Sequence, residues 1–415
     1  MQGIPAGFAL TAIANYLLGQ HIESNRVGTF IAIVGIPWTG QFIWGPFIDR
    51  FQYSSMGHRR HWIVFSQWAS ILASLGLLSV TDPQYQLSLL SLVFFIHSIF
   101  ASIQVASVDA MAISITPIHE RGKVNGYMRG GFLLGTAFGA AVLSDVIHEY
   151  SFKSAALIQI ITLAFFSICF FFTKLDRKDQ LLPFSLKRKR SHSINPDEEQ
   201  EKESKPEAEN PAFKVVFKKI IAGIMNRVSL HYFVVVAAVY FCSSVFIRSY
   251  TYHLINVLKW SDKTVSILQG GWGSIVTFIA IILAGINSDK IGAKPMQVKV
   301  TWGVCIFLII LNLTSTIWRY DLYSGAALLL WNIADPLLSV TIFPILMGLC
   351  IKKVEGSQFT TYLALINLCD VVGSYATGWS LSVVSAPVLG LSCGIFLLII
   401  MLYLRSRQYT LIPDQ

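Results

Sequence analysis

The sequence predicts an all-helical integral membrane protein, with twelve transmembrane helices arranged as two pseudo-symmetric six-helix bundles. Of its 415 residues, 54% are hydrophobic and 13% are charged, whereas soluble chains carry about 25% charged residues. Apolar stretches of eighteen or more residues recur along the whole chain, and each can cross a hydrocarbon core roughly 30 Å thick. The ten-residue alternation of a transmembrane barrel does not occur, which favours helices.

The apolar stretches define twelve expected membrane-spanning ranges. The first begins almost at Met1 and looks truncated at its start, which leaves an upstream start codon open. The sequence shows neither the basic region nor the cleavage site of a signal peptide. The ranges are 3–21, 27–49, 61–80, 86–116, 122–147, 153–173, 228–256, 263–288, 295–317, 322–351, 357–384 and 386–404.

The basic residues are unequally shared between the two sides of the predicted membrane protein. If the N-terminus is cytoplasmic, the cytoplasmic connections and the C-terminus hold 25 Lys and Arg residues, and the opposite side holds five. This asymmetry follows the positive-inside rule and places both termini in the cytoplasm. It also explains the net charge of +9 without nucleic acid as a partner.

A polar segment divides the chain between the sixth and seventh predicted helices. It contains "KRKRSHSINPDEEQEKESKPEAENP" and has no apolar face, so we expect a largely disordered cytoplasmic linker. Residues 213–225 place lysines among apolar residues at helical spacing, as in a short helix on the membrane surface. The predicted units are an N-terminal bundle (1–174), the linker (175–227), a C-terminal bundle (228–405) and a tail (406–415).

The sequence gives no sign of a metal or nucleotide site. All six cysteines fall inside apolar stretches without metal-ligand spacing, so we interpret them as small hydrophobic residues. The nucleotide-binding pattern GxxxxGK[ST] is also absent from the sequence. We therefore expect no cofactor and a proton gradient as the driving force.

One short motif occurs twice, 240 residues apart. "GPFIDR" (45–50) ends the second predicted helix, and "GINSDK" (285–290) ends the eighth. Both place a glycine four positions before an acidic residue that a basic residue follows. Two six-helix halves repeated in parallel are typical of transporters whose substrate site lies between the halves, near the middle of the bilayer.

The first copy of the motif, with the "GHRR" (57–60) that follows, resembles the loop signature of the major facilitator superfamily. Within that superfamily, "GIPWTGQFIWGPFIDRFQYSSMGHRRHW" (35–62), "ASIQVASVDA" (101–110), "ERGKVNGYMRGG" (120–131) and "SQFTTYLAL" (357–365) are similar to segments of the AmpG-type permeases. The resemblance implies the major facilitator fold and a multi-pass protein of the bacterial cytoplasmic membrane. It also implies import of anhydro-muropeptides by proton symport for peptidoglycan recycling.

Two positions depart from the family pattern. Val105 stands where the family usually has an acidic residue, and "LHYFVVVAAVYF" (230–241) lacks the charges that usually open the seventh span. These differences weaken the muropeptide assignment and leave the transporter assignment in place.

Charged residues within the predicted spans are candidates for proton coupling or the substrate pathway, because a charge at bilayer depth is costly unless it is paired or hydrated. Asp109 and Arg129 fall at similar depths on adjacent antiparallel helices and can form an ion pair. Asp335 precedes Pro336, which interrupts helical hydrogen bonding. A structural ion pair remains the alternative for each candidate. The candidates are Asp109, Arg129, Arg248, Asp335 and Asp370, with His97 and His253 as further titratable groups.

The repeated motif also predicts a cytoplasmic gate. The resemblance places Asp49 at the positive N-terminus of the eleventh helix and Asp289 at that of the fifth, where an acid is favourable. Gly45 is expected to allow close helix approach, and Arg59 and Arg60 to hold their loop inside the cell. The predicted gate comprises Gly45, Asp49, Arg50, Arg59, Arg60, Gly285, Asp289 and Lys290.

A series of glycines in the fifth span predicts close helix packing. According to the resemblance, this span packs against the opposite half. The glycines are Gly126, Gly130, Gly131, Gly135 and Gly139.

The leading functional hypothesis is therefore a monomeric secondary transporter of a small molecule, and not an enzyme. The alternative keeps the fold and changes the cargo to another sugar conjugate, an acyl-coenzyme A or an amphipathic drug. Polar and aromatic residues such as Trp38 and Asn367 could line a cavity for a sugar or a peptide.

Overall fold

The computed structural model describes residues 1–51, 53–115, 121–174, 179–181, 221–291, 293–350 and 355–406. Within these ranges the chain is helical, apart from two strands of two residues each. Ten of the described helices are long and apolar enough to cross a membrane, and residues Gly3–Gly19 form a shorter apolar segment. The 26-residue helix α18 (Glu355–Ser380) accounts for the remaining predicted span.

The N-terminal half contains the first six predicted spans. Its elements are α1 (Gly3–Gly7), η1 (Phe8–Ile13), α2 (Ala14–Gly19), α3 (Ser24–Thr39), α4 (Gln41–Arg50), α5 (Arg60–Leu75), η2 (Gly76–Ser79), α6 (Leu87–Ile115), α7 (Arg121–Ala137), η4 (Phe138–Val142), α8 (Leu143–Glu149) and α9 (Phe152–Phe172). The described helices resume at residue 221, so most of the predicted linker and surface helix lies outside the described residues.

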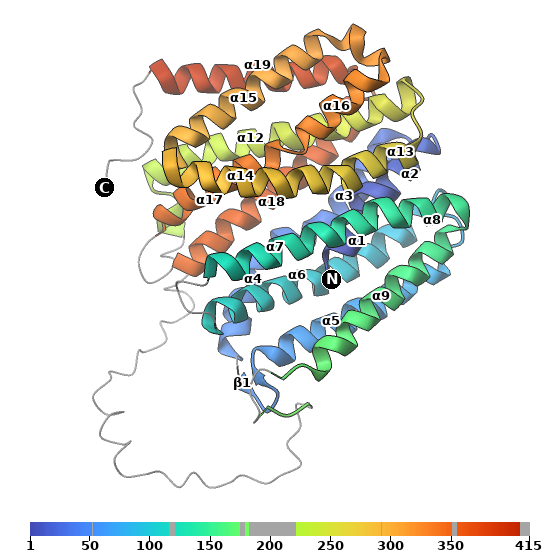
Figure 1. Cartoon of the computed structure of the whole chain (residues 1–415), viewed down its shortest axis with the longest axis vertical. Helices are drawn as coiled ribbons and strands as arrows, with labels where there is room; N and C mark the ends of the chain where they lie inside the picture. The colour runs from blue at the N-terminus through green and yellow to red at the C-terminus, as the bar shows by residue number, and fades with distance from the viewer. Residues whose placement is uncertain are drawn as a thin grey trace.

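The C-terminal half contains the other six spans. Its elements are α12 (Arg227–Tyr252), η5 (His253–Val257), α13 (Asp262–Ser266), η6 (Ile267–Trp272), α14 (Gly273–Ile291), α15 (Ala293–Leu313), η7 (Ser315–Arg319), α16 (Asp321–Trp331), α17 (Ala334–Gly348), α18 and α19 (Ala386–Ser406). Figure 1 shows this half, in yellow to red, above the blue-to-green N-terminal half.

Apolar side chains explain both the interior and the outer surface of these bundles. Leu17, Phe94 and Phe246 are buried where helices meet. Leu72 and Phe172 are exposed, as expected for side chains that face lipid rather than water. Because backbone groups find no partners in hydrocarbon, each apolar stretch satisfies its own hydrogen bonds as a helix.

Two spans are broken at defined positions. The second span is interrupted at Gly40, between α3 and α4, three residues after Pro37. The tenth span is interrupted between Trp331 and Ala334, directly before the predicted Asp335-Pro336 pair. Thr277 of α14 donates to the Asn332 carbonyl at this break (2.9 Å), so the freed backbone group has a partner.

The two halves meet along several pairs of helices. α3 packs along α18, and η4 of the fifth span packs against η6 of the eighth. Figure 1 shows α7 and α14 side by side between the halves, with α2, α8 and α13 grouped at one end. We call this the closed end. The end that carries the short β1 (Tyr53–Ser54) and β2 (Gly57–His58) hairpin is the linker end.

Candidate functional site

A cavity of about 200 Å³ lies between the halves. The first, second, fourth and fifth spans contribute its N-terminal side, and α18 contributes the C-terminal side. Its polar lining residues are Gln2, Trp38, His97, Ser98, Asn367 and Asp370, and its apolar ones include Leu10, Val34, Phe94, Phe132 and Val371. A cavity that both halves line is where a transporter of two repeated bundles would hold its solute.

Hydrogen bonds fix the α18 side of this cavity. Ser244 of α12 donates to the backbone carbonyl of Asp370 (2.9 Å) and contacts the Ser374 hydroxyl (3.2 Å). The Asn367 amide donates across the interface to the Trp38 carbonyl (3.4 Å). These contacts hold the backbone of α18 in place, while the Asp370 side chain lines the cavity and remains half-buried.

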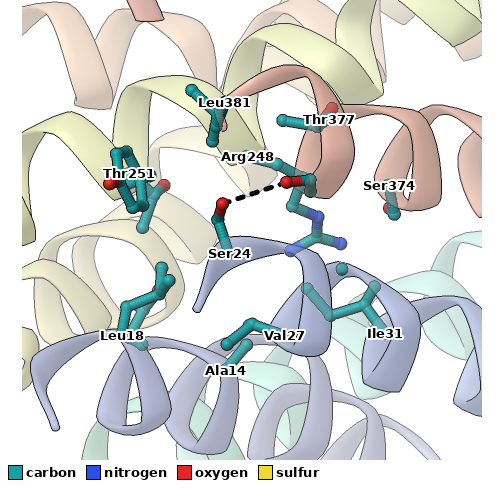
Figure 2. Close-up of a pocket in the computed structure, with 14 residues that line it drawn as sticks. Ala14, Leu18, Ser24, Val27, Ile31, Arg248, Thr251, Ser374, Thr377 and Leu381 are labelled. Atoms are coloured by element: carbon teal, nitrogen blue, oxygen red, sulfur yellow. Dashed lines mark hydrogen bonds between the residues drawn. The ribbon is translucent and has the colours of Figure 1, made fainter. Parts of the chain in front are cut away.

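Arg248 lies beside a second, smaller pocket of about 30 Å³ (Figure 2). Its guanidinium Nη1 donates to the Leu10 carbonyl across the interface (3.0 Å). Leu10 belongs to η1, a π-helical turn, in which the regular helical hydrogen bonds are displaced. Ser24 donates to the Gly378 carbonyl at the same pocket (3.0 Å). Arg248 therefore connects the C-terminal half to an irregular turn of the first span.

Four π-helical turns of the described chain contribute to the interface between the halves. They are η1, η4, η5 and η6, in the first, fifth, seventh and eighth spans. η4 contacts both η1 and η6, and η5 contacts α2. π-helical turns are rare and occur frequently at functional sites. Their grouping here marks the region where the halves would have to move against each other.

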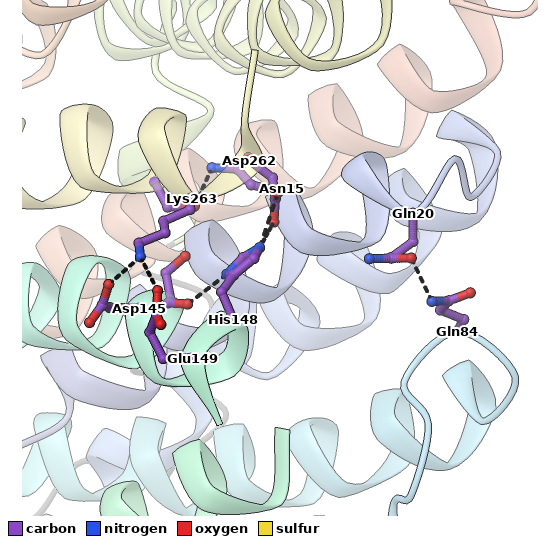
Figure 3. A network of polar contacts seen from close by, with 10 residues as sticks. Asn15, Gln20, Gln84, Asp145, His148, Glu149, Asp262 and Lys263 are labelled. Carbon is purple, nitrogen blue, oxygen red and sulfur yellow. Dashed lines mark hydrogen bonds and ion pairs between the residues drawn. The ribbon is translucent and has the colours of Figure 1, made fainter. Parts of the chain in front are cut away.

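Charged side chains join the halves at the closed end (Figure 3). Lys263 Nζ of α13 lies 2.6 Å from Asp145 Oδ1 and 2.9 Å from Glu149 Oε1, both on α8. His148 Nε2 lies 3.0 Å from Asp262 Oδ2. All three pairs link the fifth span to the eighth. Because their side chains are partly exposed, we expect weak ion pairs that can break and re-form.

Uncharged hydrogen bonds at the closed end also join the first span to the eighth and the connection after the first span to the seventh. The Asn15 amide donates to the Ser266 hydroxyl (3.0 Å), and His21 Nδ1 lies 3.3 Å from Asn256 Oδ1. A Cβ added at Gly19 would lie 3.1 Å from the Asp262 Cβ. The halves are therefore in direct contact at the closed end.

The candidates for proton coupling are spread over the molecule. Asp370 lines the central cavity, Arg248 lines the smaller pocket, and Asp109 is exposed on α6. The side chains of Arg129 and Asp335 lie outside the described residues, although their backbones belong to α7 and α17. The Asp109–Arg129 pair therefore remains a prediction.

Most of the predicted gate falls outside the part of the chain whose side chains are described. This applies to Asp49, Arg50, Gly285, Asp289 and Lys290. A Cβ at Gly45 would have no atom within 4 Å among the described residues, so the close helix approach expected there is not observed.

The two remaining gate residues make defined contacts at the linker end. Arg59 adopts a left-handed conformation (φ 56°) and donates to the Ala110 carbonyl (2.7 Å). Arg60 is fully buried, and its guanidinium donates to the Gln180 (3.1 Å) and Phe171 carbonyls. Arg60 thus joins the start of α5 to the end of α9 and to the beginning of the linker, a contact that the sequence did not reveal.

The fifth span packs against the opposite half as expected, through α7 on α14 and η4 on η6, but its glycines do not all take part in that contact. Gly135 and Gly139 pack against α1 of the same half, where an added Cβ at Gly139 would collide with the Ile4 carbonyl. A Cβ added at Gly130 would make an ordinary van der Waals contact with the Phe278 ring of α14. A Cβ added at Gly131 would have no neighbour within 4 Å among the described residues. The Gly126 side-chain environment lies outside the described part. The close approach to the opposite half is made by Gly270, against Ala140.

Sequence reasoning missed the ion pairs of the closed end. Asp145 and Glu149 are four residues apart near the end of the fifth span, and Asp262 and Lys263 begin the eighth. Spacing of four residues places two side chains on the same helix face. This local signal was available, but it did not indicate which helix the acidic face would meet.

Comparisons with known proteins agree with this architecture. The family model of the Major Facilitator Superfamily matches residues 2–376. A crystal structure of a mutant of the peptide transporter POT, in complex with sulfate, superposes with a TM-score of 0.65 at 10% identity. The match covers 100% of this chain and 94% of that one. At this identity the superposition shows a shared fold.

Several curated bacterial proteins are similar in sequence. The anhydromuropeptide permease of Escherichia coli K12 is 24% identical over 32% of this chain and 28% of its own length. The putative transporter AmpG 3 of Rickettsia typhi is 22% identical over 67% and 63%. An uncharacterized Haemophilus influenzae protein is 28% identical over 32% of each chain. The matches to the E. coli and H. influenzae proteins thus span about a third of those relatives.

The predicted family is confirmed by the family match, and the predicted all-helical, multi-span architecture agrees with the shared fold. The AmpG-like branch suggested by the sequence motifs is supported by relatives of modest identity. The chain belongs to the Major Facilitator Superfamily.

Proposed function

We propose that the protein is a proton-coupled secondary transporter that imports anhydro-muropeptides across the bacterial cytoplasmic membrane by alternating access. The observation that carries this proposal is the central cavity, which both halves line and which lies between halves that are joined at the closed end. The positive-inside distribution supports an orientation in which the closed end lies outside the cell. Solute would then leave toward the linker end, with both termini in the cytoplasm.

The cargo proposal rests on the relatives. The E. coli relative is named an anhydromuropeptide permease, and two Rickettsia relatives are named putative AmpG transporters. The cavity supports a solute with hydroxyl and amide groups, because aromatic and polar side chains line it together. Another sugar conjugate, an acyl-coenzyme A and an amphipathic drug are the competing cargoes.

The proton proposal rests on acidic residues in the spans. Asp370 lines the cavity that would hold the solute. Asp109 and Asp335 remain candidates from their positions in α6 and α17. A carboxylate that is protonated in one state and ionised in the other would couple proton movement to the exchange between states.

Uptake into proteoliposomes that contain the purified full chain tests both proposals. We expect labelled N-acetylglucosaminyl-anhydro-N-acetylmuramic acid to accumulate when the vesicle interior is alkaline. A protonophore should abolish the accumulation. An acyl-coenzyme A and an amphipathic dye serve as competing cargoes in the same vesicles. Uptake that a protonophore does not alter would contradict proton coupling, and uptake of another cargo alone would contradict the muropeptide assignment.

A further inference from the structure

His97 lies on α6 at the central cavity and is almost completely buried, with 3% of its surface exposed. Its Nδ1 lies 3.0 Å from the Ser70 carbonyl and 2.8 Å from the Ser74 hydroxyl, both on α5. Ser74 also donates to the Ser70 carbonyl (2.9 Å). The Nδ1 of His97, in the fourth span, therefore has its hydrogen-bond partners in the third span.

These contacts determine the tautomer. A carbonyl oxygen can only accept, so a lone pair on Nδ1 would face the lone pairs of the Ser70 oxygen. The network therefore assigns the proton to Nδ1, which donates toward α5. In the neutral imidazole, Nε2 is then a hydrogen-bond acceptor.

Nε2 is buried and has no hydrogen-bond partner among the described residues. A buried polar atom without a partner destabilises a protein, so native structures satisfy nearly all such atoms with protein, water or ligand. His97 lines the cavity, although Nε2 itself has almost no accessible surface in this state. A solute that donates a hydrogen bond would provide the missing partner once the side chains beside Nε2 move to admit it.

The rest of the lining narrows the kind of solute. Trp38, Phe94 and Phe132 supply aromatic surface, whereas Ser98, Asn367 and Asp370 supply hydrogen-bonding groups. A saccharide ring presents apolar C–H faces and polar edges, which matches this mixture. No Lys or Arg is among the described residues of the lining, so a phosphate or carboxylate there would lack a counter-charge.

The size of the cavity limits how much of the solute it holds. Pockets that enclose whole ligands are typically about 300–1,000 Å³, and this cavity measures about 200 Å³. It therefore suits one ring of a larger conjugate rather than the complete molecule.

We propose that His97 Nε2 accepts a hydrogen bond from a hydroxyl or amide N–H of one uncharged saccharide unit, and that His97 thereby determines specificity. This inference deepens the proposed transport function and rests on it. The charged remainder of a conjugate would lie outside this cavity.

Equilibrium binding of the labelled disaccharide N-acetylglucosaminyl-anhydro-N-acetylmuramic acid to the full chain in nanodiscs tests the inference. His97→Phe retains a ring and removes the acceptor, so we expect at least a tenfold increase in Kd. His97→Gln places an amide oxygen near the Nε2 position and should remain within about threefold of the wild type. A tenfold change corresponds to about 1.4 kcal/mol, the scale of one hydrogen bond.

Gln159→Leu is a matched control. Gln159 of α9 is fully buried, and neither of its side-chain polar atoms has a partner among the described residues. Unlike His97, it lines neither of the two pockets. We expect Gln159→Leu to leave Kd unchanged. The Tm of each variant, measured in the same nanodiscs, separates a loss of binding from a loss of folding.

Three results would overturn the inference. The first is a His97→Phe variant that keeps both its Tm and the wild-type Kd. The second is a wild-type protein that accumulates an acyl-coenzyme A or the dye and binds no saccharide, in which case the transport proposal survives without the saccharide site. The third is a wild-type protein that accumulates none of the solutes, in which case the transport proposal fails as well.

If His97→Phe does not fold, nitrogen NMR of histidine-labelled wild-type protein replaces it. Addition of the disaccharide should shift the Nε2 resonance of His97, assigned by its loss in His97→Gln. An unchanged Nε2 resonance at saturating disaccharide would contradict the inference.

Discussion

His148 of the N-terminal half and Asp262 of the C-terminal half lie 3.0 Å apart, from Nε2 to Oδ2, although 114 residues separate them in sequence. Beside them, Lys263 contacts Asp145 and Glu149 (Figure 3). These contacts join the fifth span to the eighth at one end of the molecule. If the transporter alternates between two open states, they must break in one state and re-form in the other.

A covalent bond across this junction should stop transport. The Gly19 Cβ position lies 3.1 Å from the Asp262 Cβ, slightly below the 3.5–4.5 Å usual in disulfides. In a chain whose six native cysteines are replaced by alanine, we expect Gly19→Cys with Asp262→Cys to lose uptake on oxidation. Reduction should restore it.

A disulfide within one half is the control for this experiment. The Gly76 Cβ position lies 3.8 Å from the Val93 Cβ, and both residues belong to the N-terminal half. Gly76→Cys with Val93→Cys should therefore crosslink without blocking uptake. Unimpaired uptake through the oxidised Gly19–Asp262 pair would contradict movement at the closed end.

Loss of the Lys263 charge should favour separation of the halves at the closed end. Lys263→Ala removes the cation that two acidic residues share and leaves those acids facing each other. Spin labels on the connections after α2 and before α13 should show a larger population at long distance. Lys153→Ala, an exposed lysine for which the structure describes no ion pair, is the matched control and should leave the distances unchanged.

Asp370→Asn tests the proton-coupling role of the cavity carboxylate. The amide has a similar shape but cannot release a proton, so we expect uphill accumulation to be lost while exchange of internal and external solute continues. Proteoliposome uptake with and without a pH gradient measures the two activities separately. Asp321→Asn, at the exposed start of α16, should accumulate normally. Normal accumulation by Asp370→Asn would exclude Asp370 from proton coupling.

Two glycines of the fifth span should respond in opposite ways to alanine. A methyl group at Gly139 would collide with the backbone carbonyl of Ile4, so we expect Gly139→Ala to destabilise the protein by about 1–3 kcal/mol. Gly131 has open space among the described residues, and Gly131→Ala should be neutral or stabilise by up to about 1 kcal/mol. Thermal unfolding in detergent compares them, and equal Tm values would contradict the packing of α1 on η4.

Arg60→Lys should destabilise the linker end. A lysine carries one ammonium group and cannot reach the Phe171 and Gln180 carbonyls with the fork of a guanidinium. Loss of these buried, charge-assisted hydrogen bonds should lower stability by about 3 kcal/mol. Arg319→Lys on the exposed surface should change Tm little. Limited proteolysis near residue 180 provides a second measurement, because cleavage should become faster in Arg60→Lys.

The sequence by itself determined the class of this protein and the positions of its helices. Apolar stretches predict helices because lipid leaves backbone groups no other partner. The expected second span, 27–49, agrees with the observed α3 and α4, Ser24–Arg50. The interruption near Asp335-Pro336 was likewise predictable, since proline cannot support a continuous helix. These properties depend on neighbouring residues in the chain.

Only the tertiary structure decided which side chains meet. Asp145 and Lys263 are as far apart in sequence as many pairs that never touch, and their contact depends on how the fifth and eighth spans pack. The tertiary structure likewise decided the surroundings of His97. Its Nδ1 contacts residues of α5, whereas its Nε2 has no partner among the described residues. Hydropathy and spacing describe one helix at a time, whereas a cavity or an ion pair between the halves depends on the relative placement of several helices.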